Sequence, residues 1–137
     1  MVSLVSPDPI GASVFIVEDE PLIAFDIASF LESADYKVIG PFATVSEAVE
    51  AATADQIDIA VLDVRLRGAP VWPIAEILQT RGVPFVFLTG YARTEPFPAQ
   101  FAHVVRLEKP FSEDQLMTAI VSAFKSADPV CQLGLLR

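Results

Sequence analysis

The chain has 137 residues, enough for one ordinary domain, and its 53% hydrophobic residues can bury a real core, which excludes wholesale disorder. A formal net charge of −9 argues against direct nucleic-acid binding, because an acidic surface repels a phosphate backbone. With one cysteine, no apolar run long enough to cross a bilayer and no signal-peptide pattern at the N-terminus, we expect a cytoplasmic protein that does not act at a membrane.

The first half of the chain alternates between apolar runs and helical patterns. Residues 12–17 predict a strand, and Pro21 opens a helix at a position that proline favours. Residues 36–40 predict a second strand, and residues 45–54 a second helix. Residues 57–64, apolar apart from two aspartates, predict a third strand.

The second half continues this alternation. Residues 68–70 predict a loop, residues 72–80 a helix and residues 84–89 a fourth strand. Residues 101–107 hold a fifth strand, and residues 113–125 form the last helix.

Capping residues mark several helix ends. Thr44 and Glu47 have the spacing of a capping box, and Ser112 is placed to cap the last helix. Gly82 lies where a left-handed residue ends a helix. Pro96 and Pro98 interrupt the place where a fourth helix should lie, so we expect that helix to be short, displaced or disordered.

Continuously apolar strands that alternate with helices predict a parallel sheet covered on both faces. We therefore expect an α/β, doubly wound, five-stranded three-layer sandwich, with the flavodoxin-like strand order 2-1-3-4-5. Residues 11–126 are expected to form this domain, after a flexible N-terminal extension over residues 1–10. Residues 127–137 are expected to be a short tail, too short for an output domain.

Polar side chains follow four of the predicted strands. Glu18 and Asp19 come after the first strand, Asp63 and Thr89 lie at the ends of the third and fourth, and Lys109 follows the fifth. The carboxyl ends of parallel strands form the ligand edge of such a sheet. Clustered carboxylates need a cation, and oxygen ligands suit Mg²⁺. Each residue alone is commonplace, but together they predict phosphoryl chemistry, with the central Asp63 as nucleophile.

Four short motifs resemble the receiver domain of two-component response regulators. They are VEDE (17–20), VLDVRL (61–66), FLTGY (87–91) and EKPF (108–111), and the resemblance covers about residues 12–125. It implies a stand-alone phosphoacceptor protein that depends on Mg²⁺. Such a protein assists its own phosphorylation and dephosphorylation but is not an enzyme that acts on other substrates.

The resemblance also assigns roles to single residues. Asp63 would be the phosphoacceptor, and the magnesium ligands would be Glu18, Asp19, Asp63 and the backbone carbonyl of Arg65. Thr89 and Lys109 would bind the phosphoryl group, and the Lys109–Pro110 peptide bond would be cis, a geometry that a following proline permits.

The sequence departs from the common receiver pattern in two places. The acidic pair is Glu18–Asp19 instead of two aspartates, and Arg106 stands where most receivers have a switch aromatic. The segment ending in Tyr91 resembles a single-domain subfamily named for a Phe-Ala-Thr-Gly-Tyr (FATGUY) motif, which would make Tyr91 part of the switch. The implied partners are a histidine kinase, of the HWE or a related type, and a phosphotransfer protein or another regulator. The implied assembly is a monomer or weak dimer.

Three other functions compete with this reading. A pseudo-receiver would signal by binding alone. The complete set of acidic residues, Thr89 and Lys109 argues against this function. A phosphatase of the aspartyl-phosphate class would need an acid at position 65, where the chain has arginine. A flavin-binding module would need a phosphate loop after the first strand, where Glu18, Asp19 and Glu20 repel phosphate.

Overall fold

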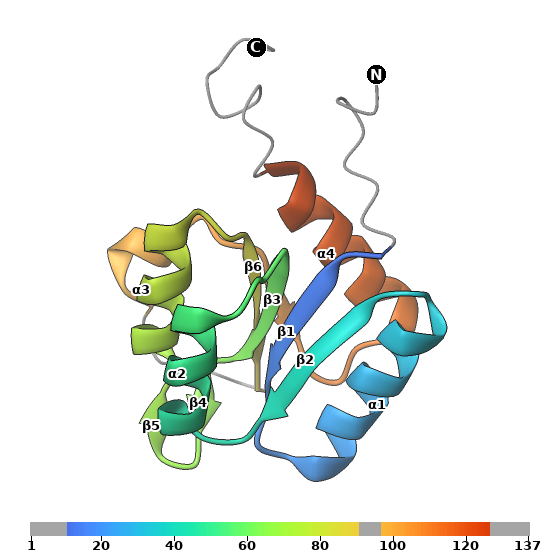
Figure 1. The fold of residues 1–137 in the computed structure, drawn as a ribbon, viewed down its shortest axis with the longest axis horizontal. Coiled ribbons are helices and arrows are strands. Elements are labelled where there is room, and N and C mark those ends of the chain that lie inside the picture. Colours follow the sequence, from blue (N-terminus) through green and yellow to red (C-terminus); the bar gives the residue numbers. More distant parts are fainter. Residues whose placement is uncertain (1–10, 91–96, 127–137) are drawn as a thin grey trace, which may run out of the picture.

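The computed structural model describes residues 11–90 and 97–126, which hold a five-stranded parallel sheet in the order β2-β1-β3-β6-β7 (Figure 1). Its strands are β1 (Ser13–Val17), β2 (Lys37–Phe42), β3 (Ile59–Asp63), β6 (Phe85–Thr89) and β7 (Arg106–Glu108). In the order in which these strands occur along the chain, this is the predicted 2-1-3-4-5 arrangement. The flavodoxin-like fold is therefore confirmed.

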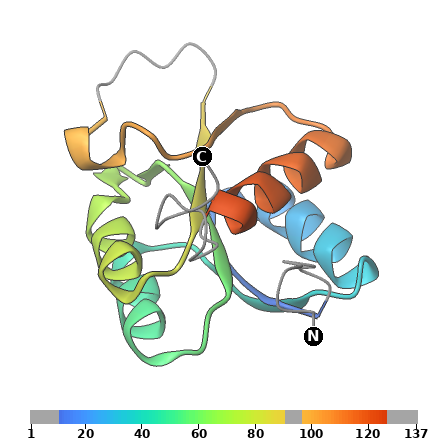
Figure 2. The same ribbon diagram turned by 90° about the horizontal axis from the view of Figure 1, so that it is seen from above.

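Helices cover both faces of this sheet. They are α1 (Pro21–Ser33), α2 (Val45–Ala54), α3 (Trp72–Arg81) and α4 (Glu113–Ser126). Figure 2 shows α1 and α4 on one face and α2 and α3 on the other. Each face has its own buried apolar cluster, because the central strands are buried on both sides. None of the helices in residues 11–90 and 97–126 is long and apolar enough to span a bilayer.

The helix ends follow the predicted capping residues. The Thr44 hydroxyl accepts a hydrogen bond from the Glu47 amide at 3.3 Å, and Gly82 ends α3 with a φ of 75°. Ser112 and Gln115 form a reciprocal capping box before α4, with hydrogen bonds of 3.1 and 2.8 Å. The short polar residues between the apolar runs therefore set the helix boundaries.

Two predicted segments are corrected by the structure. The fifth strand, predicted over residues 101–107, is limited to β7, because Phe101 belongs to a 3-10 turn, η2 (Ala99–Phe101), whose burial competes with strand pairing. The predicted loop at residues 68–70 is half of an antiparallel hairpin, β4 (Arg65–Leu66) and β5 (Ala69–Pro70). The interrupted fourth helix falls largely on residues 91–96, which lie outside the described residues.

An aromatic cluster joins α3 to the sheet and to η2. The Trp72 ring lies 5.6 Å from Phe87, 5.2 Å from Phe97 and 5.8 Å from Phe101, measured between ring centroids. The Arg106 guanidinium carbon lies 3.6 Å from the centroid of the Phe97 ring, in cation–π geometry. This cluster packs Phe97 and Phe101, which precede β7, against α3 and the sheet.

Candidate functional site

The strand register brings the polar strand ends to one edge of the sheet. In the parallel pairing, Val17 lies opposite Leu62, Asp63 opposite Leu88 and Thr89 opposite Glu108. Residues that follow β1, β3, β6 and β7 therefore meet at the carboxyl edge, as the sequence predicts.

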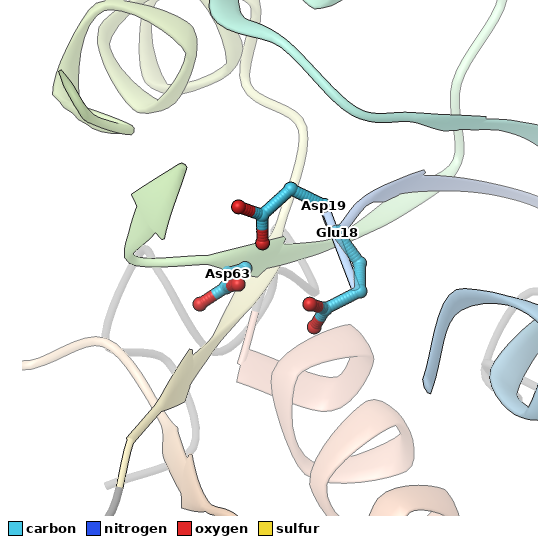
Figure 3. A group of neighbouring side chains, drawn as sticks. All are labelled: Glu18, Asp19 and Asp63. Atoms are coloured by element: carbon cyan, nitrogen blue, oxygen red, sulfur yellow. The ribbon is translucent and has the colours of Figure 1, made fainter. Parts of the chain in front are cut away.

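Three carboxylates from two neighbouring strands form the centre of this edge. Glu18, Asp19 and Asp63 each offer an oxygen, and these oxygens lie within 4.8 Å of one another. Figure 3 shows Glu18 and Asp19 following β1 and Asp63 at the end of β3. Glu18 is 2% exposed and Asp63 is 5% exposed, so both carboxylates are buried. Buried like charges this close require nearby positive charge.

Lys109 supplies one positive charge. Its Nζ lies 3.0 Å from Glu18 Oε1, and it donates hydrogen bonds of 3.3 Å to Glu18 Oε2 and to Asp63 Oδ2. The Lys109 amide donates to the Thr89 carbonyl at 2.9 Å, and the Lys109–Pro110 peptide bond is cis. The backbone after β7 is thereby tied to the end of β6 and aims the ammonium at both buried carboxylates.

Arg67 supplies a second positive charge, through a contact with Asp19 that the sequence does not predict. The Arg67 amide donates a 2.9 Å hydrogen bond to Asp19 Oδ2, and its Nε lies 3.8 Å from the same oxygen. The hairpin after β3 positions this residue, and Arg65 begins that hairpin two residues after Asp63. The sequence signal for this hairpin was the Arg67–Gly68 pair, which lies between two short segments. A glycine at the second position of such a pair favours a two-residue turn. Tyr91 lies outside the described residues.

The residues fit a divalent cation. Glu18 Oε1 is buried and, within the part of the chain that the structure describes, makes no aligned hydrogen bond despite its proximity to Lys109. The Lys109 ammonium is its ion-pair partner, and the oxygen keeps lone-pair capacity for a metal ion. Carboxylate oxygens on a sheet edge are the ligands that Mg²⁺ prefers.

The buried carboxylate of Asp63 is a weak acid. Burial raises its pKa from the ordinary 3.8 to about 7, Glu18 adds to this rise, and Lys109 opposes it. Burial lowers the pKa of Lys109, but the charge of Asp63 and the contacts with Glu18 outweigh this effect and leave the pKa above its ordinary value of 10.5. Lys109 therefore stays charged while Asp63 titrates near neutrality.

This titration predicts a pH-dependent stability. The pKa of Asp63 is higher in the folded than in the unfolded chain, so the metal-free fold loses stability as pH rises from about 4 to about 7. We expect Asp63→Asn to be more stable than the wild type by up to about 4 kcal/mol at about pH 8, and by little near pH 4. Urea unfolding followed by circular dichroism in a chelator measures the difference. A difference that stays constant with pH would contradict the raised pKa.

Comparisons with known proteins agree on one family. The model of the response regulator receiver domain matches residues 14–121. The solution structure of SdrG from Sphingomonas melonis Fr1 is 38% identical with a TM-score of 0.72, and the match covers 82% of this chain and 95% of that one.

Curated proteins give more distant matches. The transcriptional regulatory protein PdtaR of Mycobacterium tuberculosis is 33% identical over 118 residues, which are 82% of this chain and 58% of PdtaR. The phyllosphere-induced regulator PhyR of Methylorubrum extorquens is 33% identical over 84 residues, which are 59% of this chain and 32% of PhyR. The chain thus spans little more than half of PdtaR and about a third of PhyR.

Proposed function

Since this chain belongs to the family of response regulator receiver domains, we propose that it receives a phosphoryl group from a histidine kinase on Asp63. The observation that carries the proposal is the contact between Lys109 Nζ and Asp63 Oδ2, 3.3 Å apart, on a buried carboxylate at the end of the central strand β3. A carboxylate held beside an ammonium is suited to attack an anionic phosphoryl group.

The transfer needs one bond to form and one to break. An Asp63 oxygen forms the bond to phosphorus while the bond from phosphorus to the imidazole nitrogen of the kinase phosphohistidine breaks. The ammonium of Lys109 offsets the negative charge of the phosphoryl oxygens. The Thr89 hydroxyl donates a hydrogen bond to one of these oxygens.

The proposed cofactor is Mg²⁺. The carboxylates of Glu18, Asp19 and Asp63, which lie together, would hold it with the backbone carbonyl of Arg65, two residues after Asp63. When bound, it supplies positive charge that neutralises phosphoryl oxygens and the carboxylate cluster.

A groove beside the site supports docking of a helical partner. It has a volume of about 980 Å³, is lined by residues of α1 and α4 that include Ile23, Phe30 and Leu116, and reaches Lys109. On the same helix α1, Leu22 is 81% exposed and Phe25 is 67% exposed. Large exposed apolar side chains next to a groove suit an amphipathic helix, such as one that presents a phosphohistidine.

We assign the chain to the single-domain FATGUY subfamily, with a kinase of the HWE type as donor. Arg106, packed on Phe97, occupies the place of the usual switch aromatic, which supports a different switch that would include Tyr91. The unit over residues 11–126 would act in the cytoplasm as a monomer or weak dimer. It would signal through protein contact or onward phosphotransfer to a phosphotransfer protein or another regulator, without binding nucleic acid.

Intact mass after incubation with phosphoramidate and Mg²⁺ tests the proposal. We expect one added phosphoryl group in the wild type and in Asp58→Asn, a matched change just before β3, and none in Asp63→Asn or without Mg²⁺. Modification of Asp63→Asn to the same extent would place the acceptor elsewhere. A wild-type protein that neither gains mass nor binds beryllofluoride with Mg²⁺ would be a pseudo-receiver, and the proposal would be wrong.

A further inference from the structure

The turn of the β4–β5 hairpin holds Arg67 in an unfavourable backbone conformation. Arg65 pairs with Pro70 and Leu66 with Ala69, so Arg67 and Gly68 form a two-residue turn. Their φ angles are 41° and 85°, both positive, as a type I′ turn requires. Glycine or asparagine adopts this conformation at lower cost than arginine. The turn itself therefore does not explain why arginine, and not glycine or asparagine, stands at position 67.

The hairpin holds Arg67 firmly beside the site. Leu66 is 1% exposed within the core cluster that faces α2 and α3, and the Val71 amide donates a 2.8 Å hydrogen bond to the Val64 carbonyl at the base of the hairpin. The Arg67 amide closes the arrangement through its bond to Asp19. The location of the guanidinium thus follows from the fold of the hairpin.

Lys109 and Arg67 contact different carboxylates of the cluster. Lys109 contacts Glu18 and Asp63, whereas Arg67 contacts Asp19. The Arg67 side chain is 65% exposed and that of Asp19 is 17% exposed, so this ion pair faces solvent while that of Lys109 is buried. A solvent-facing ion pair is weak and easily exchanged.

We propose that Arg67 is a displaceable counter-ion of Asp19 that sets how tightly the site holds its divalent cation. This inference rests on the proposed function, in which Asp19 is a metal ligand. A guanidinium and a divalent cation at Asp19 each offset the charge of this carboxylate, and their like charges repel. Arg67 therefore neutralises the cluster in the metal-free protein and weakens metal binding.

Calorimetric titration of the full chain with Mg²⁺ tests this role. Arg67→Asn removes the guanidinium but keeps the backbone amide that bonds Asp19, in a turn that asparagine suits. We expect it to bind Mg²⁺ about 3- to 10-fold more tightly than the wild type at low ionic strength, with the difference shrinking at about 0.5 M salt. Arg67→Lys keeps the positive charge and should remain within about 2-fold of the wild type.

Lys37→Asn is the matched control, because it removes one exposed positive charge at the start of β2, at the opposite edge of the sheet. Its affinity for Mg²⁺ should equal that of the wild type. The inference is overturned if Arg67→Asn binds no more tightly than Lys37→Asn, or if Arg67→Lys binds as tightly as Arg67→Asn. A wild type and an Arg67→Asn variant that both bind no Mg²⁺ would instead refute the metal site of the proposed function.

Discussion

Replacing Lys109 with methionine is expected to lower the free energy of unfolding of the metal-free protein by about 3–5 kcal/mol at about pH 8. Methionine keeps an unbranched apolar stem but removes the ammonium that contacts Glu18 and Asp63. Both carboxylates are buried, so the variant must either hold two like charges away from water or take up a proton at Asp63, and both cost free energy at about pH 8. Urea unfolding in a chelator, followed by circular dichroism, measures the loss.

Lys125→Met is the control for this substitution. Lys125 lies in the last turn of α4 and is exposed, so its replacement should change the free energy of unfolding by less than about 0.5 kcal/mol. Saturating Mg²⁺ should restore part of the stability of Lys109→Met, because a cation bound by the carboxylates offsets their repulsion. Equal stabilities of the two variants without metal would show that Lys109 does not neutralise the buried pair.

The second large effect is expected in the core. Phe87→Ala should lower the free energy of unfolding by about 3–5 kcal/mol, because it removes a fully buried ring and leaves a cavity. Four aromatic rings contact Phe87, with centroid distances of 5.3 to 5.6 Å, and they are those of Trp72, Phe85, Phe97 and Phe101. Because these rings pack against one another, the structure around the cavity can collapse only partly.

Phe25→Ala provides a matched comparison on the surface. The Phe25 side chain is 67% exposed on α1, so the same chemical change there should alter the free energy of unfolding by less than about 0.5 kcal/mol. The same denaturation experiment measures both variants. If Phe25→Ala and Phe87→Ala lowered the free energy of unfolding by similar amounts, the burial of Phe87 in β6 would be contradicted.

Hydropathy patterning was sufficient to predict the parallel sheet, whereas the strand order was expected from the fold type, because periodicity does not record order. Strands β1, β3 and β6 are continuous apolar runs because both faces of each are covered, and helices such as α2 begin at recognisable caps. The extent of β7 could not be predicted in this way. Residues 101–105 are apolar enough for a strand, but Phe101 packs into the core from a 3-10 turn, a tertiary preference that periodicity does not record.

The carboxylate cluster was predictable because the carboxyl ends of parallel strands share an edge, which requires only the element order. The contact of Arg67 with Asp19 was not predicted, because it joins residues 48 positions apart and depends on a hairpin of two-residue strands. Such short strands carry no periodic signal. The cation that faces Asp19 was therefore visible only once the register of the hairpin was known.

Trp72 gives this molecule an optical probe that needs no label. It is the single tryptophan of the chain, so indole emission has one source. Its neighbours include Phe97 and Phe101, which precede β7 and hence Lys109 along the chain. Emission wavelength and intensity depend on how an indole ring is packed and on its contact with water. A rearrangement that separates η2 from α3 would therefore change the fluorescence of the unmodified protein, and stopped-flow mixing could follow it in time.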